Sequence, residues 1–106
     1  MNVLDEDNLT PLHIAARNGR VGVVRVLLEH GANIGAEDKI GITPLHAAVV
    51  GRSGVRQNER AEVVSALLEH GANVGAKDNM DRTPFQIALS VGNGKIVKLL
   101  SEYGAK

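Results

Sequence analysis

The chain has 106 residues with 12 acidic and 12 basic side chains, so its formal net charge at pH 7 is zero, which gives no electrostatic argument for a nucleic-acid or membrane partner. Aromatic residues make up 2% of the sequence, which argues against a surface that stacks bases, and no run of 18 apolar residues predicts a membrane span. Cysteine is absent, which excludes a disulfide scaffold and thiolate metal sites and favours a cytoplasmic location, with signal-independent export as an open alternative.

A short motif divides the chain into three units. Thr-Pro-Leu-His begins at Thr10 and again at Thr43, and an altered copy, Thr-Pro-Phe-Gln, begins at Thr83. The two intervals are 33 and 40 residues, which indicates a period of 33 with seven extra residues in the middle unit, at about Arg52–Asn58. Such a period is typical of stacked repeats, in which each unit buries its apolar face only against its neighbours.

Each unit is predicted to contain two short helices. Threonine is a good N-cap and proline suits the first helical turn, so the first helix of each unit begins directly after Thr10, Thr43 or Thr83. A second helix rich in Val, Ile and Leu follows a polar or glycine-containing break, and a glycine just past its end favours termination in the left-handed conformation. These second helices are predicted over 21–30, about 60–70 and about 95–103.

The TPLH motif, the Ala-Ala pair behind it and the LLEHGAN sequence that ends the second helix together resemble the ankyrin-repeat family. The resemblance covers roughly residues 5–105. It implies an all-α repeat fold, an α-solenoid, in which helix-turn-helix units stack side by side and β-hairpin or loop fingers project at about a right angle. It also implies one domain spanning 1–106, with repeats at about 5–37, 38–77 and 78–106, and a concave surface of fingers and first helices that usually binds the partner.

The two end units differ in what they expose. The third unit departs from the family pattern at Phe85, Gln86, Leu89 and Ser101, which is typical of a C-terminal cap that faces water. The first unit has the pattern of an internal repeat and no polar cap before it. Two interpretations follow: the chain is part of a longer array, or its first face is tolerated or is paired by weak head-to-tail self-association.

Histidine occupies two repeat positions, His13 with His46 and His30 with His70. A group that performs one reaction is seldom copied into every unit, so we interpret the first pair as structural: the imidazole bonds the threonine hydroxyl and a neighbouring backbone group. Gln86 at the same position of the third unit supports this, because an amide can bridge in the same way but cannot transfer protons or bind zinc well. We therefore expect no metal, no cofactor and no catalysis.

Three polar segments have a functional alternative beside a structural interpretation. Residues 92–95, Gly-Asn-Gly-Lys, lack the leading glycine and the Ser/Thr of a phosphate loop, so they are interpreted as a turn between helices. The acidic residues 5–7 are interpreted as a solvated finger, with a contact patch for a partner as the alternative. Arg52 and Arg56 lie on a glycine-rich loop with Arg60 close behind, and a tolerated insertion is favoured over a grip on a phosphate or carboxylate.

The strongest functional signal is a set of apolar residues at positions that the resemblance assigns to exposed fingers and to the concave side of the first helices. Stacking needs no apolar residue there, and an exposed apolar stripe commonly marks a partner site. The alternative is that finger side chains tuck against the adjacent finger. The predicted partner-binding residues are Glu6, Asp7, Arg17, Lys39, Ile40, Ile42, Val50, Asn79, Met80, Arg82 and Val91. Their apolar members would be anchors, and their basic members would orient charged groups.

The sequence therefore predicts a non-catalytic protein–protein interaction module that binds a protein or peptide. The alternative is an architectural or regulatory ankyrin segment of a larger multidomain protein. An enzyme is the third class, and it would need a deep pocket lined by convergent polar groups, which a stack of three thin units hardly provides.

Overall fold

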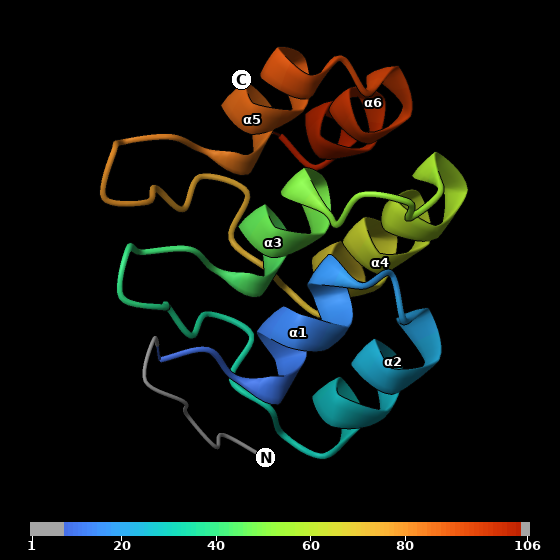
Figure 1. Cartoon of the computed structure of the whole chain (residues 1–106), viewed down its shortest axis with the longest axis vertical. Coiled ribbons are helices and arrows are strands. Elements are labelled where there is room, and N and C mark those ends of the chain that lie inside the picture. The colour runs from blue at the N-terminus through green and yellow to red at the C-terminus, as the bar shows by residue number, and fades with distance from the viewer. Residues whose placement is uncertain (1–7, 105–106) are drawn as a thin grey trace.

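Six helices form three successive pairs in the computed structural model, which describes residues 8–104. They are α1 (Pro11–Arg17), α2 (Val21–Glu29), α3 (Pro44–Val50), α4 (Gln57–Glu69), α5 (Pro84–Val91) and α6 (Gly94–Glu102). The first helices pack in the order α1, α3, α5 and the second helices in the order α2, α4, α6, so the pairs stack along one axis (Figure 1). Residues 8–104 contain no strand, and turns project from one side of the stack (Figure 1). This confirms the all-α repeat prediction, with fingers made of turns instead of β-hairpins.

The first helix of each pair begins where the sequence predicts. The Oγ1 atom of Thr10 accepts a hydrogen bond from the backbone N–H of His13 at 3.2 Å, and Thr43 does the same for His46 at 3.3 Å. The side chain of the third helical residue bonds back to the threonine N–H, which completes a capping box in every unit. These bonds satisfy amide groups that a helix N-terminus leaves without an intrahelical partner.

The same histidines tie each unit to the next one. The Nδ1 atom of His46 accepts from the backbone N–H of Thr43 at 3.3 Å, so the ring proton lies on Nε2. This Nε2 donates to the carbonyl oxygen of Arg82 in the following finger at 2.8 Å, and His13 donates to Ile42 in the same way at 2.7 Å. Both imidazoles are buried. The structural interpretation of this histidine position is confirmed.

The extra residues of the middle unit form both a loop and a helical extension. Helix α4 has 13 residues, against 9 in α2, and begins at Gln57, so the predicted start at about Arg60 is wrong. The reason is local: the side chain of Glu59 accepts from the backbone N–H of Arg56 at 3.3 Å, which caps the helix earlier. The preceding loop is closed by Arg60, whose Nη2 donates to the carbonyl oxygen of Arg52 at 3.1 Å.

Turns follow α2 and α4 and precede α6, as predicted. Gly31 and Gly71 follow α2 and α4 with φ values of 84° and 88°, in the left-handed region. Between α5 and α6, the side chain of Asn93 accepts from the backbone N–H of Ile96 at 3.2 Å and caps α6. Residues 92–95 therefore contain the turn that follows α5 and the first residues of α6, which begins at Gly94.

Apolar residues at equivalent repeat positions form one continuous core between the helix pairs. Leu12 and Leu45 of the first helices, and Leu67 and Leu100 of the second helices, are at most 1% exposed. Burying a side chain of this size contributes about 1.5–3 kcal/mol. The core holds neighbouring units in a fixed register, which positions the first helices and the fingers relative to one another.

Candidate functional site

An aspartate folds the tip of each described finger. Oδ1 of Asp38 accepts hydrogen bonds from the backbone N–H groups of Ile40 and Ile42, both at 2.9 Å. Asp78, at the equivalent repeat position, accepts from the same two positions of the next finger, again at 2.9 Å. Side chain-to-backbone bonds of this kind fix a turn without a β-ladder, so the finger side chains point in set directions.

Asp78 is also the ion-pair partner of Arg82. Its Oδ2 accepts from Nε of Arg82 at 2.8 Å, and the carboxylate is buried while the arginine side chain is 46% exposed. Burial of Asp78 by itself raises its pKa, but hydrogen bonds from the backbone N–H groups of Arg82 and Met80 and from the Arg82 guanidinium have the larger combined effect, so this pKa lies below its ordinary value. Arg82 is thus held in place with part of its side chain in solvent.

Asn79 connects the two described fingers. Its backbone N–H donates to the carbonyl of Ile40 at 3.0 Å, and its Nδ2 donates to the carbonyl of Lys39 at 3.2 Å. A Cβ at Gly41, where φ is 81°, would lie 2.7 Å from Oδ1 of Asn79 and 2.9 Å from its backbone nitrogen, so the close approach requires glycine. The two fingers therefore form one joined surface.

A pocket of about 320 Å³ lies where this surface meets the first helices. It is lined by Leu9, His13, Arg17, Asp38, Ile40, Ile42, Ala47, Val50 and Arg82. Five of these are predicted partner-binding residues, and they come from all three units. Ile40 and Val50 are about half exposed, and Ile42 is partly buried against the core. The pocket therefore combines accessible apolar side chains with two arginines.

The other predicted residues do not line this pocket. Met80 is 72% exposed on the last finger, and Val91 is half exposed at the end of α5. Lys39 and Asn79 take part in the contact between fingers instead. The alternative in which finger side chains are tucked away does not hold for Met80, which is open to solvent.

Two predicted residues cannot be placed, and two residues that shape the fingers were not predicted. Glu6 and Asp7 lie outside the residues that the structure describes. The roles of Asp38 and Asp78 were not predicted, although an aspartate precedes Thr43 and Thr83 at the same distance, which is the signal that could have found them.

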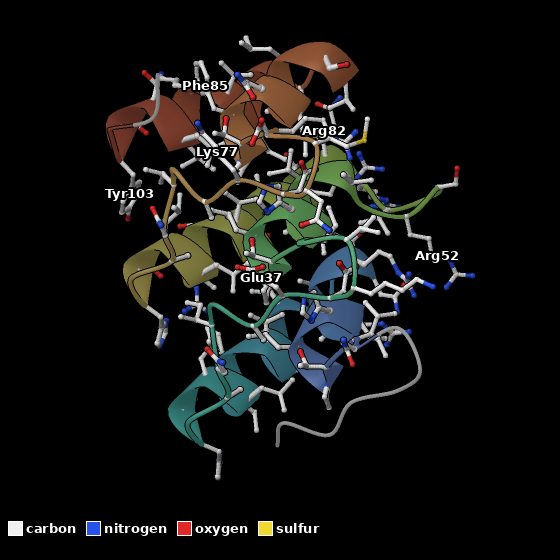
Figure 2. The ribbon with its side chains drawn as sticks, turned by 90° about the vertical axis from the view of Figure 1, so that its left-hand side faces the viewer. Glu37, Arg52, Lys77, Arg82, Phe85 and Tyr103 are labelled. Atoms are coloured by element: carbon white, nitrogen blue, oxygen red, sulfur yellow. The ribbon has the colours of Figure 1, made fainter. Side chains whose placement is uncertain are left out.

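Two arginines of the middle unit, Arg60 and Arg52, point to different surroundings. Arg60 is engaged with the backbone of its own loop, and a Cβ at Gly51 would collide with its guanidinium. Arg52 projects from the loop into solvent, on the same side as Arg82 in the view of Figure 2. This arrangement favours the tolerated insertion over a phosphate or carboxylate grip.

Two features of the described part of the chain concern metal ligands and membrane-spanning helices. Within residues 8–104, no three His, Cys, Asp or Glu side chains gather closely enough to hold a metal ion. None of the six helices there combines the length and the apolar composition that crossing a bilayer requires.

Comparison with known proteins gives matches along the whole chain. A family model described as ankyrin repeats (3 copies) matches residues 1–78 and 41–106. A protein of Rickettsia bellii named as an ankyrin repeat protein is 61% identical over 41 residues, which are 39% of this chain and 17% of that protein. Human Rabankyrin-5 is 49% identical over 49 residues, 46% of this chain and 4% of that protein. The NF-kappa-B inhibitor cactus of Drosophila yakuba is 40% identical over 52 residues, 48% of this chain and 11% of that protein.

The chain therefore matches only a small share of each relative's length, 17% at most among these three. The two ranges of the family model together extend from the first residue to the last. They agree with the geometry, in which three helix pairs begin at threonine caps and histidines bridge each unit to the next. The chain belongs to the ankyrin-repeat family, whose members are generally non-enzymatic protein-interaction modules.

Proposed function

We propose that this chain binds a protein or peptide segment through the concave surface of its fingers and first helices, without catalysis of its own. The observation that carries the proposal is the pocket, because it places the exposed apolar side chains of Ile40 and Val50 beside arginines of two other units. An apolar pocket with a few convergent polar groups is the default hypothesis for a binding site.

The pocket favours a partner segment that carries a carboxylate next to an apolar side chain. The apolar side chain would contact Ile40, Ile42 and Val50, while the carboxylate would pair with Arg17 or Arg82. A full protein interface buries about 800 Å² on each partner, which is more than this pocket provides. The surrounding part of the proposed interface consists of Glu6, Asp7, Lys39, Asn79, Met80 and Val91.

Affinity measurements on surface variants test the proposal. Peptides selected from a random library on the full chain supply the ligand, and isothermal titration calorimetry gives its dissociation constant. Ile40→Ser combined with Val50→Ser should weaken binding by more than about tenfold, because a few anchors carry most of the energy. Met80→Ser, outside the pocket, should cost less. The thermal midpoint should barely change, since all three side chains are exposed.

A matched control replaces Val23 and Val26, which are about equally exposed but absent from the pocket, with serine. If the Ile40/Val50 variant binds as tightly as this control, or if it loses its fold, the proposed site is wrong.

A second candidate is an architectural or regulatory segment of a larger protein. The small share of each relative that the chain matches, 17%, 4% and 11%, favours it. In that case the pocket variant would leave the larger protein's activity unchanged, whereas exchange of the repeats for an unrelated spacer would alter it. We place either form in the cytoplasm, on the ground of the cysteine-free composition, with neither nucleic acid nor membrane as the partner.

A further inference from the structure

The two ends of the stack expose opposite faces of the same repeating unit. We call α1 with α2 unit 1, α3 with α4 unit 2, and α5 with α6 unit 3. The leading face of a unit packs on the unit before it, and the trailing face packs on the unit after it. Unit 1 lies at the lower end of the stack in Figure 1 and unit 3 at the upper end. Within the described residues, nothing packs on the leading face of unit 1 or the trailing face of unit 3.

The leading face of unit 1 is apolar and open. Three of its side chains are exposed: Ile14 by 39%, Val23 by 50% and Val26 by 53%. Their equivalents in unit 2 are all buried: Ala47 is 8% exposed, and Val63 and Ala66 are 0% exposed. The face also carries a shallow depression, lined by Pro11, Ile14, Ala15, Asn18, Arg20 and Val23. Unit 1 thus presents the same apolar surface that unit 2 buries against a neighbour.

The trailing face of unit 3 is partly apolar as well. Leu89 is 56% exposed, whereas Ala16 and Val49 at the same repeat position are 0% exposed. A cap that only faced water would not need a leucine at a position where the other units bury a side chain completely.

Charged residues at the two ends are equivalent to an ion pair that forms between units inside the stack. Between units 1 and 2, Nη1 of Arg25 lies 3.5 Å from Oε1 of Glu69. The residue of unit 3 equivalent to Arg25 is Lys98, and the residue of unit 1 equivalent to Glu69 is Glu29. Both are exposed. Unit 3 of one molecule stacked on unit 1 of another would therefore bring Lys98 to Glu29. The cation would lie on the trailing face and the carboxylate on the leading face, as in the Arg25–Glu69 pair.

We infer that the chain self-associates head to tail, with the trailing face of unit 3 of one copy seated on the leading face of unit 1 of the next. The apolar contact is between Leu89 and the exposed side chains around Val23, and the Lys98–Glu29 pair lies at its edge. Because the two surfaces differ, the interface is heterologous and the assembly is open-ended. It uses neither finger nor pocket, so it is independent of the proposed binding of a peptide.

Sedimentation velocity of the full chain between about 10 μM and about 1 mM, the range of weak association, tests this inference. The weight-average mass should rise above 11.2 kDa as concentration increases. Val23→Glu blocks the leading face and Leu89→Glu blocks the trailing face, and each variant alone should stay monomeric. An equimolar mixture of the two should form a one-to-one dimer that does not grow, because one intact face of each kind remains.

A mass that stays at 11.2 kDa for the unmodified chain would overturn the inference and leave the leading face to another occupant. Association that Val23→Glu abolishes but Leu89→Glu leaves intact would also overturn it, because the interface would then join two leading faces. Lys98→Glu should weaken association by about two- to fivefold, the scale of an exposed ion pair, and Glu29→Lys in the same chain should restore it. This pair keeps the test decisive if either of the other two substitutions disturbs folding. The Ile40/Val50 variant should associate normally.

Discussion

The buried histidine at position 46 should be among the side chains that this stack can least lose. Nδ1 of His46 contacts the backbone N–H of Thr43 at 3.3 Å and the Thr43 hydroxyl at 2.8 Å, and Nε2 donates to the carbonyl of Arg82 at 2.8 Å. The side chain is 0% exposed. His46→Ala removes every one of these contacts from a buried site.

The cost can be worked from these contacts. A net hydrogen bond contributes about 0.5–1.5 kcal/mol, and a buried group left without its partner costs about 1–3 kcal/mol. The space left by the imidazole adds a cavity term. Together, His46→Ala should lower the free energy of unfolding by about 3–4 kcal/mol, a large part of the 5–15 kcal/mol that is usual for a domain. His46→Gln should cost only about 1–2 kcal/mol, because an amide keeps one acceptor and one donor.

The chain itself supplies the precedent for glutamine. Oε1 of Gln86 accepts from the backbone N–H of Thr83 at 3.0 Å, as Nδ1 of the histidines does in units 1 and 2. Urea unfolding followed by circular dichroism near neutral pH measures the three free energies. The control is His70→Ala, which removes an exposed imidazole that donates to the carbonyl of Ala66 at 2.9 Å. A loss for His46→Ala no larger than the control's, or equal to that of His46→Gln, would refute the reasoning.

Two further predictions concern the finger residues Gly41 and Asp78, with Gly22 of α2 as a comparison for the first. Gly41→Ala should destabilise the fold by about 1–3 kcal/mol, because the φ of 81° and the close approach to Asn79 leave no room for a Cβ. Gly22→Ala should instead stabilise the fold by about 0.5–1 kcal/mol, because Gly22 lies inside α2 and a Cβ there would have no atom within 4 Å. Thermal and urea unfolding of both variants check the opposite signs. Because the folded-state pKa of Asp78 lies below its unfolded value, its stabilising effect should be complete above the unfolded pKa of about 3.9 and should be lost as pH falls through the folded pKa. Unfolding free energies of Asp78→Asn between neutral pH and acid should lack this loss, and an acid dependence equal to that of the unmodified chain would contradict it.

The short-range features could be predicted from the residue pattern. The cap at Thr43 and the left-handed residue at Gly71 depend on bonds and steric limits within a few positions along the chain. The start of α4 was predicted wrongly because Glu59 caps the helix one turn earlier. The residues of the insertion could therefore form either loop or helix. Which of the two forms depends on how Arg60 closes the loop, and this contact is a matter of tertiary packing.

The joining of the fingers could not be predicted in this way. Asn79 bonds to Ile40 across about one repeat, and nothing in the residues around either position signals that contact. The assembly of Arg17, Val50 and Arg82 around one pocket likewise depends on the order and register of three helix pairs.

The period, the helix caps and the family follow from the order of residues alone, because the capping hydrogen bonds of each repeat join residues only a few positions apart. The stacking of units settles which of these similar residues meet water. Val23 and Val63 are the same residue at the same repeat position, yet one is 50% exposed and the other 0%, because only the second has a unit packed over it. Burial here is a property of the neighbour and not of the side chain, and so the accessible surface, with the pocket and the two open ends, belongs to the three-dimensional arrangement.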